Sequence, residues 1–198
     1  MDRLTLQVGT FEVNCTILSA AGKALVVDPG SEADRILETL AKNNLAPEAI
    51  LLTHAHFDHI GGVAKLQEAY PDLPVYVHPA DVPAFTHPLN QLPPDYPPVP
   101  APKNVRDART FDRAQVIETP GHTPGGVCYL FTADKLLFSG DTLFAGSIGR
   151  TDLPGGDMMT LMASLERLKE LPPETAVIPG HGMFTTIERE LAGNPFLQ

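Results

Sequence analysis

The sequence predicts an α/β fold, because short apolar segments of strand length alternate with segments that have the apolar periodicity of helices. The predicted strands fall into two groups along the chain: residues 4–8, 14–18, 24–27, 49–52 and 75–78, and then residues 114–118, 127–131, 135–138 and 176–178. By itself this alternation establishes only the α/β class. Two groups of strands with helices outside them suit, more specifically, a four-layer αβ/βα sandwich.

The first predicted helix follows the third strand. A turn at Asp28-Pro29-Gly30 ends that strand, and Ser31 begins the helix in a capping box that has Asp34 at its third position. Apolar residues recur along the helix at helical spacing: Ala33, Ile36, Leu37, Leu40 and Ala41. This stripe predicts that the helix packs against one face of the sheet.

Residues 53–62 concentrate three histidines and one aspartate directly after a predicted strand. His54 and His56 are two residues apart in extended backbone, so their side chains project to the same side. Asp58 and His59 follow where the chain turns toward two glycines. Packing gives no reason to gather four polar groups with such high desolvation costs, so the HxHxDH pattern predicts a metal site.

Residues 79–102 contain nine of the twenty prolines and have neither strand nor helix periodicity. A long ordered loop in a compact domain is more often functional than not, so we expect a rigid wall or lid near the active site. Its expected apolar contacts are Phe85, Leu89, Leu92 and Tyr96. His78 and His87, each before a proline, lie outside the metal pattern, and we interpret both as structural or surface residues.

The second half of the chain predicts a hairpin and two helices. A two-residue turn at 133–134 joins neighbouring strands as a hairpin. Asp157 caps the next helix. The apolar stripe of that helix is a core face rather than a cofactor site: Met158, Leu161, Met162, Leu165 and Leu168. Thr185 and Glu188 form a capping box that opens the C-terminal helix.

The composition bounds the class of protein. A chain of 198 residues suits one domain with a full core, so we expect residues 1–198 to form a single domain. No apolar run has the length of a membrane span and the start lacks a signal-peptide pattern, which predicts a cytoplasmic protein without membrane contact. A net charge of −10 argues against a nucleic-acid partner. Cys15 and Cys128 lie in apolar segments, so we expect buried free thiols. Nothing in the sequence indicates the oligomeric state.

Three more segments place a histidine or an aspartate between an apolar strand and a glycine: those of His122, Asp141 and His181. Each polar residue therefore lies at the C-terminal end of a predicted strand, where loops gather functional groups. The order of these motifs, from about residue 25 to the C-terminus, resembles the metallo-β-lactamase superfamily. Within it, the chain is similar to the short, single-domain bacterial hydroxyacylglutathione hydrolases of glyoxalase II type.

The resemblance implies a four-layer αβ/βα sandwich of two mixed sheets with outer helices, and a centre of two divalent metal ions. The implied ligands are His54, His56 and His122 on the first metal, Asp58, His59 and His181 on the second, and Asp141 on both. Asp58 and Asp141 would also be catalytic, together with a hydroxide that bridges the metals. Imidazole and carboxylate ligands suit zinc, iron and manganese, and we expect zinc.

Two residues near the predicted centre each have two interpretations. Asp28 either orients a metal-binding histidine from behind or only forms the turn after its strand. Arg150 either binds an anionic substrate, because a guanidinium group holds a carboxylate with two hydrogen bonds, or forms an ion pair with Asp152 or Asp157. The substrate role matters because the chain has no C-terminal helical domain of the kind that supplies glutathione-binding cations in the long glyoxalase II enzymes.

The activity that the resemblance implies is hydrolysis of a small-molecule thioester such as a hydroxyacyl-glutathione, for example S-lactoylglutathione. One alternative is a mononuclear-iron oxidoreductase, the persulfide dioxygenase, whose family shares the ligand order and a Gly-Arg-Thr-Asp segment like residues 149–152. A non-catalytic metal-binding protein is disfavoured by the complete ligand set. β-Lactam hydrolysis is disfavoured too, because the β-lactamases of the superfamily lack an acidic bridge at the position of Asp141.

Overall fold

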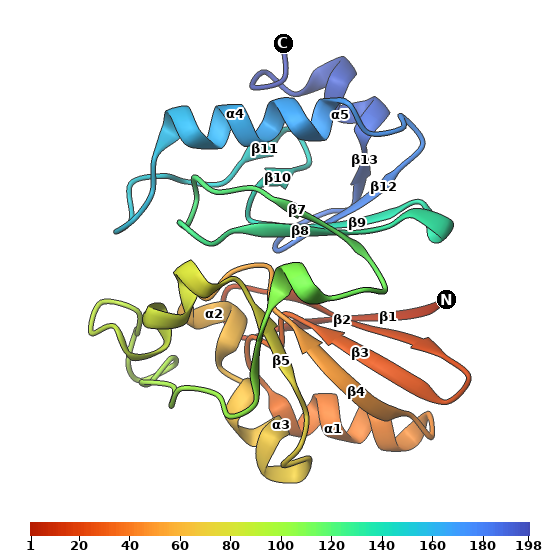
Figure 1. Ribbon diagram of the computed structural model, residues 1–198, viewed down its shortest axis with the longest axis vertical. Coiled ribbons are helices and arrows are strands. Elements are labelled where there is room, and N and C mark those ends of the chain that lie inside the picture. The colour runs from red at the N-terminus through yellow and green to blue at the C-terminus, as the bar shows by residue number, and fades with distance from the viewer.

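The computed structural model describes residues 1–198 and contains two β-sheets that face each other, with helices on the outer face of each (Figure 1). The first sheet follows the order of the chain: β1 (Asp2–Val8), β2 (Val13–Ala20), β3 (Lys23–Val27), β4 (Ala46–Leu51), β5 (Val75–Val77) and β6 (Val105–Asp107). Strands β1 to β3 are antiparallel and strands β3 to β6 are parallel, so this sheet is mixed.

The second sheet has the strand order β13-β12-β9-β8-β7. Its strands are β7 (Gln115–Glu118), β8 (Val127–Phe131), β9 (Leu136–Gly140), β12 (Ala176–Pro179) and β13 (Thr185–Thr186). Strands β9 and β12 are parallel and the other pairs are antiparallel, so this sheet is mixed too. The predicted hairpin of β8 and β9 is confirmed, with a short 3₁₀ helix, η3 (Thr132–Asp134), in its turn. A ribbon of β10 (Leu143–Phe144) and β11 (Ser147–Ile148) follows β9.

The longer helices lie outside the sheets (Figure 1). Helices α1 (Ala33–Lys42) and α3 (Val63–Ala69) cover the first sheet, and helices α4 (Met158–Lys169) and α5 (Ile187–Gly193) cover the second. Helix α2 (Phe57–Ile60) is a single turn within the segment of three histidines. Two further 3₁₀ helices are η1 (Pro79–Thr86) and η2 (Ala108–Thr110). None of the helices combines the length and the apolar character that a membrane crossing requires.

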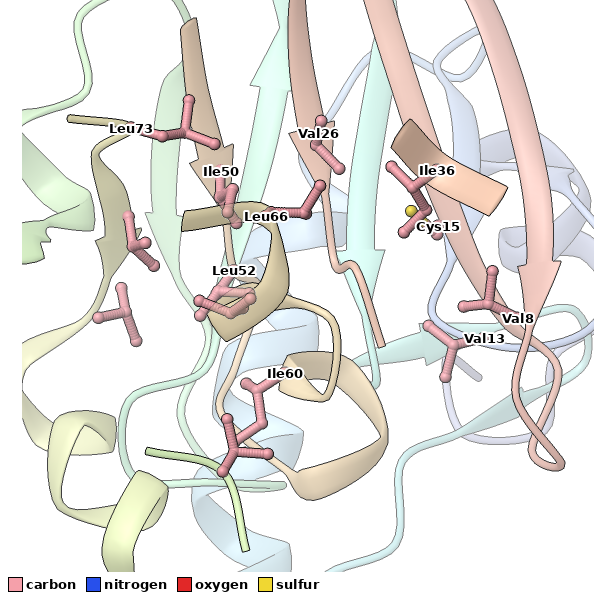
Figure 2. Packing of buried hydrophobic residues seen from close by; sticks show 14 of the residues in the cluster. Val8, Val13, Cys15, Val26, Ile36, Ile50, Leu52, Ile60, Leu66 and Leu73 are labelled. Carbon is pink, nitrogen blue, oxygen red and sulfur yellow. The ribbon is translucent and has the colours of Figure 1, made fainter. Parts of the chain in front are cut away.

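Three layers of buried apolar side chains separate these four layers of backbone, which confirms the four-layer sandwich. Strand β3 shows how, because alternate side chains of a strand point to opposite faces. Val26 belongs to the cluster under α1 and α3, together with Ile36 and Leu66 (Figure 2). Its neighbours Leu25 and Val27 belong to the cluster between the two sheets. A third cluster lies between the second sheet and its helices and includes Leu137, Val177, Leu161 and Leu165.

The predicted cap of the first helix is wrong. Helix α1 begins at Ala33, and its N-cap is Glu32, in left-handed backbone (φ 50°) and without a side-chain capping bond. The Glu32 carboxylate accepts instead from the backbone N–H of Gly9, at 2.8 Å, and from Arg35, at 3.0 Å. Ser31 therefore lies before the cap, because a contact with the β1–β2 turn determines where the helix starts.

Of the other two predicted caps, one is confirmed and one is wrong. Asp157 caps α4 as predicted and accepts from the backbone N–H of Thr160 at 2.7 Å. The cap of α5 is wrong by one residue, because Thr186 accepts from the N–H of Arg189 while Thr185 donates to the buried Glu190. The sequence spacing therefore predicted where this helix begins to within one residue. The hydroxyl of Thr185 is not the cap because it is bonded to Glu190.

Both cysteines are free and buried, as predicted. Burial raises the pKa of the Cys15 thiol far above its ordinary value and that of Cys128 to about 11. Each thiol therefore stays protonated at neutral pH and packs as an apolar side chain.

Candidate metal centre

The predicted ligands come together at one edge of the sandwich, because each follows the carboxyl end of a strand. His54 and His56 follow β4, and the turn of α2 adds Asp58 and His59. The remaining three follow the carboxyl ends of strands in the second sheet: His122 after β7, Asp141 after β9 and His181 after β12. Strands β7, β9 and β12 run in the same direction, so their carboxyl ends meet at the same edge.

The first predicted ligand group is made of imidazoles alone. Nδ1 of His56 lies 2.8 Å from Nε2 of His122, and one nitrogen atom of each of His54, His56 and His122 lies within 4.8 Å of the others. His54 is 2% exposed and His122 is 4% exposed, whereas His56 is only partly buried, so this group is enclosed except at His56. Such close nitrogen atoms form a pocket of lone pairs of the size that a single cation fills.

The second predicted ligand group mixes imidazoles with a carboxylate. Nε2 of His181 lies 3.3 Å from Nε2 of His59 and 3.4 Å from Oδ2 of Asp58. Ligand atoms of these three residues also lie within 4.8 Å of one another.

Asp141 lies between the two groups and faces both. Its Oδ1 is 3.4 Å from Nε2 of His59, while its Oδ2 is 3.5 Å from Nε2 of His122 and 3.5 Å from Nε2 of His181. Its two oxygens therefore reach ligands of both predicted groups. The structure thus brings together all seven of the side chains that the sequence singled out as ligands.

Outer partners aim the histidine rings. Nδ1 of His122 lies 2.7 Å from the carbonyl oxygen of Arg150, and Nδ1 of His181 lies 2.7 Å from that of Phe11. A carbonyl oxygen can only accept, so each Nδ1 donates and each Nε2 is the ring nitrogen that faces the cluster. Outer oxygen partners of this kind are what orients histidines that bind metals.

Unpartnered polar atoms in the cluster show that the residues fit a cation. Nε2 of His54 and Oδ1 of Asp141 are buried without a hydrogen-bond partner, and both belong to residues whose ligand atoms converge. A buried polar atom that lacks a partner costs about 1–3 kcal/mol, so the arrangement is unfavourable unless something else satisfies these atoms. Divalent cations that prefer nitrogen and oxygen ligands would do so.

The protonation states differ between the two groups. Burial lowers the pKa of His54, and burial together with His122 lowers that of His56 to about 4. Burial alone would also lower the pKa of His181, but hydrogen bonds to Asp141 and Asp58 raise it to about 10. Burial opposes ionisation of Asp141, yet the neighbouring His59 and His181 hold the pKa of its carboxyl well below the ordinary value. His54 and His56 are therefore neutral at neutral pH, whereas the second group is a set of ion pairs.

Asp28 is buried, 3% exposed, and forms the turn after its strand, whereas its role in orienting a metal-binding histidine stays a prediction. Its carboxylate accepts from the N–H and the hydroxyl of Thr53, at 2.8 and 2.7 Å, in left-handed backbone (φ 46°) that forms the turn. Its Oδ2 also lies 3.1 Å from Nδ1 of His59, although the two atoms are not aligned as a hydrogen bond. Gly62 closes this turn tightly, because its N–H donates to the carbonyl of Pro29 at 2.7 Å.

The Arg150 guanidinium pairs with Asp152, through two hydrogen bonds of 2.7 Å, so the ion-pair interpretation describes its contacts. Asp157 is not involved, since it caps α4. The side chain of Arg150 is nevertheless 61% exposed and lines a cavity of about 400 Å³ above the cluster, which we call the centre cavity. Its walls include Phe11, Phe57, Phe144, Ile148, Leu153 and five of the predicted ligands.

Residues 79–102 lie beside the cluster, but only some of the expected contacts are right. Leu89 lines a second cavity next to His56, and Tyr96 packs on the rings of Phe11 and Phe57 with centroid distances of 5.5 and 5.0 Å. The predicted contact of Phe85 is wrong, because this side chain is buried in the cluster under the first sheet. The predicted contact of Leu92 is wrong as well, because this side chain is 48% exposed and lines neither cavity.

Two residues that support the cluster were missed by the sequence interpretation. Phe11 acts through its carbonyl oxygen, which no residue-type pattern can reveal. Asp81 is 2% exposed and accepts from the N–H of Ala55, at 3.1 Å, the hydroxyl of Thr123, at 2.8 Å, and the N–H of Gly125, at 2.6 Å. It therefore ties the segment of His54 and His56 to the segment that follows His122.

His78 and His87 lie outside the cluster, in agreement with their interpretation as structural or surface residues. Nε2 of His78 lies 2.9 Å from the Glu118 carboxylate, and its Nδ1 accepts from the N–H of Ala80. Nδ1 of His87 accepts from the N–H of Leu89.

Comparison with known proteins agrees with this architecture. A model of the metallo-beta-lactamase superfamily matches residues 8–181. The probable metallo-hydrolase YqgX of Bacillus subtilis is 38% identical, over 97% of this chain and 95% of its own length. Hydroxyacylglutathione hydrolase GloC of Haemophilus influenzae is 32% identical, over 97% and 96%. A hydroxyacylglutathione hydrolase of Xanthomonas euvesicatoria is 41% identical over 83% of this chain, which spans 58% of that protein.

Solved structures give the same result. The protein TTHA1623, in a di-iron-bound form, has 43% identity and a TM-score of 0.89 over 98% of this chain and all of that one. BLEG-1, titled a B3 metallo-beta-lactamase, has 37% identity and a TM-score of 0.91 over the whole of both chains. ETHE1 from Myxococcus xanthus has 29% identity and a TM-score of 0.75, over 98% of this chain and 84% of that one. With the family model matching residues 8–181 and relatives of 32–41% identity, the chain belongs to the metallo-beta-lactamase superfamily.

Proposed function

We propose that this protein is a dinuclear metal-dependent hydrolase of thioesters such as hydroxyacyl-glutathione. The observation that carries the proposal is the position of Asp141, whose two oxygens lie 3.4–3.5 Å from imidazole nitrogens of both predicted ligand groups. A centre for one cation would not need a carboxylate that faces two complete groups. Zinc is the metal we propose. Iron is the alternative, because the similar protein TTHA1623 has been solved in a di-iron-bound form.

When bound, a pair of divalent cations would supply hydroxide at neutral pH and polarise a carbonyl group, because such cations lower the pKa of bound water to about 7. The protein supplies the rest. Asp58 lines the centre cavity, and His59 and His181 keep its pKa low against the effect of burial. As a carboxylate it can accept a hydrogen bond from the attacking water and orient it. The carbonyl groups of Phe11 and Arg150 hold the rings of His181 and His122 in place.

A thioester suits this site because a thiolate is a good leaving group and needs no general acid. The names of two relatives, the hydroxyacylglutathione hydrolases of Haemophilus influenzae and Xanthomonas euvesicatoria, support the same substrate class. Arg150 is the cation that lines the centre cavity, so we propose that it binds a carboxylate of the thiol portion by exchanging its Asp152 partner.

The test is metal analysis of the purified protein together with hydrolysis of S-lactoylglutathione. We expect close to two metal equivalents per chain and hydrolysis that a chelator abolishes. Arg150→Ala should lower kcat/KM for this anionic thioester by about tenfold, or roughly 1.4 kcal/mol, and leave a small uncharged thioester nearly unaffected. A protein with two metals that hydrolyses a β-lactam and no thioester would overturn the proposed substrate class.

A second candidate is the mononuclear-iron persulfide dioxygenase, which the likeness to ETHE1 keeps in consideration. Against it stands the second ligand group, which is complete and faces Asp141. Oxygen consumption with a persulfide substrate, at one iron per chain, would favour this candidate over the hydrolase.

A further inference from the structure

The second cavity near the centre has no assigned role. It has a volume of about 300 Å³ and lies between η1, the residues after it and the segment 153–155; we call it the loop pocket. Its walls include His56, Phe57, Ala84, Leu89, Pro124 and Leu153. Three of these, His56, Phe57 and Leu153, also line the centre cavity, so the two spaces adjoin at a predicted metal ligand. A molecule that reacts in the centre cavity can therefore extend into the loop pocket.

Most polar groups of the loop pocket already have partners, and His87, which also lines it, accepts from the N–H of Leu89 through Nδ1. Asn90 accepts from the N–H of Phe57 and donates to the carbonyl groups of Ala55 and Ala84, at 3.0, 2.8 and 2.9 Å. The buried Asp81 accepts three hydrogen bonds, one of them from the hydroxyl of Thr123. The remaining surface is mostly carbon from alanine, proline, leucine and phenylalanine side chains. A polar ligand would find few partners there, whereas an apolar one would lose little.

Charge separates the two cavities as well. The loop pocket has no lysine or arginine in its walls, whereas Arg150 lines the centre cavity. An anionic thiol such as glutathione would therefore find no lysine or arginine partner in the loop pocket, whose basic side chains are His87 and the predicted ligand His56. The thiol portion belongs on the side of Arg150, and the portion on the other side of the scissile bond is left to face the loop pocket.

We infer that the loop pocket is an acyl-binding subsite that takes an unbranched or aromatic apolar acyl group, larger than a lactoyl group. This inference rests on the proposed thioester hydrolysis and names its preferred substrates. The polar main chain of the pocket is shielded by Asn90 and Asp81, and Leu89 supplies an exposed apolar wall, 71% exposed in the empty pocket, that an acyl chain would cover.

The experiment is a series of thioesters of one small uncharged thiol, N-acetylcysteamine, with acetyl, butanoyl and hexanoyl groups, hydrolysed by the metal-loaded protein. Each buried methylene should raise kcat/KM by about fourfold. A parallel series keeps the acetyl group and lengthens the thiol instead, and it should show little dependence on length. A strong dependence on the thiol rather than the acyl chain would overturn the acyl assignment.

Leu89→Asp tests the subsite itself, because it places a charge in the wall at an exposed position that contributes little to folding. We expect the ratio of hexanoyl to acetyl kcat/KM to fall by about tenfold or more. Leu92→Asp is the matched control, since Leu92 lies in the same segment, is also exposed and lines neither cavity; its ratio should equal that of the parent.

Two negative results are distinguishable. Equal kcat/KM for all chain lengths in the parent would overturn the subsite and leave thioester hydrolysis standing. Absence of hydrolysis for every thioester, at full metal content, would overturn the proposed function and the acyl subsite together.

Discussion

The two predicted ligand groups share Asp141 but differ in charge and in how their polar atoms are paired. In the group of His54, His56 and His122, burial keeps His54 and His56 neutral, and Nε2 of His54 has no hydrogen-bond partner. The group of Asp58, His59 and His181 is charged, and its histidines act as internal counter-ions for the carboxylates. In the metal-free protein, histidine at one position is therefore an unsatisfied polar group and at another a stabilising partner. Replacing a histidine should therefore change the stability of the metal-free protein by different amounts in the two groups.

Asp141→Ala should have the largest effect, because this carboxylate faces both groups. We expect both metal equivalents to be lost and thioester hydrolysis to fall to background, measured by metal analysis and a thiol-release assay. Circular dichroism should confirm a folded chain. A variant that keeps one full equivalent would show that one group is complete without Asp141 and remove its bridging role.

The variants His56→Ala and His181→Ala test the difference between the two ligand groups. Each should lose about one metal equivalent, but the metal-free variants should differ in thermal stability. His181→Ala removes a partner of Asp58 and Asp141, which should cost about 1–3 kcal/mol of unfolding free energy. His56→Ala removes one hydrogen bond between neutral groups, the 2.8 Å contact of its Nδ1 with Nε2 of His122, so it should cost less, about 0.5–1.5 kcal/mol. Equal melting temperatures for the two metal-free variants would contradict the contrast.

Asp81→Ala should act on the first group only, because its carboxylate ties the backbone between His54 and His56 to Thr123 and Gly125. Loss of such outer support costs about 10–100-fold in metal affinity, so competition with a chelator should show one weakened equivalent and one unchanged. Asp95→Ala, an exposed carboxylate in the same proline-rich segment, is the control and should match the parent. Weakening of both equivalents would mean a general loss of structure instead.

His78→Ala should have the smallest effect. It removes a contact to the half-exposed Glu118, and such pairs are worth about 0–1 kcal/mol. Metal content should stay at the parent value, and the same holds for His87→Ala. A missing metal equivalent in either variant would show that the ligand set is assigned wrongly.

Much of the site was predictable from sequence because its signal is chemical and local. Four costly polar side chains between His54 and His59 directly after a buried strand have no packing explanation, and the resemblance that follows from the motif order supplied the fold. The supports were not predictable, because they depend on tertiary neighbours. Phe11 contributes a carbonyl oxygen, which every residue has, and Asp81 lies in a segment whose prolines hide its contacts. Ser31 failed as a cap for the same reason, since Gly9 attracts Glu32 from another element.

The hydrogen bond from His181 to the carbonyl of Phe11 joins residues that are 170 positions apart in the chain. During synthesis on the ribosome, the turn between β1 and β2 emerges long before the ring that it orients. The second ligand group therefore cannot form until residue 181 has emerged, however well the first sheet has formed. Uptake of the second cation would then require that the β1–β2 turn and the segment of His181 have packed together, which makes metal content a measure of completed folding as well as of catalytic readiness.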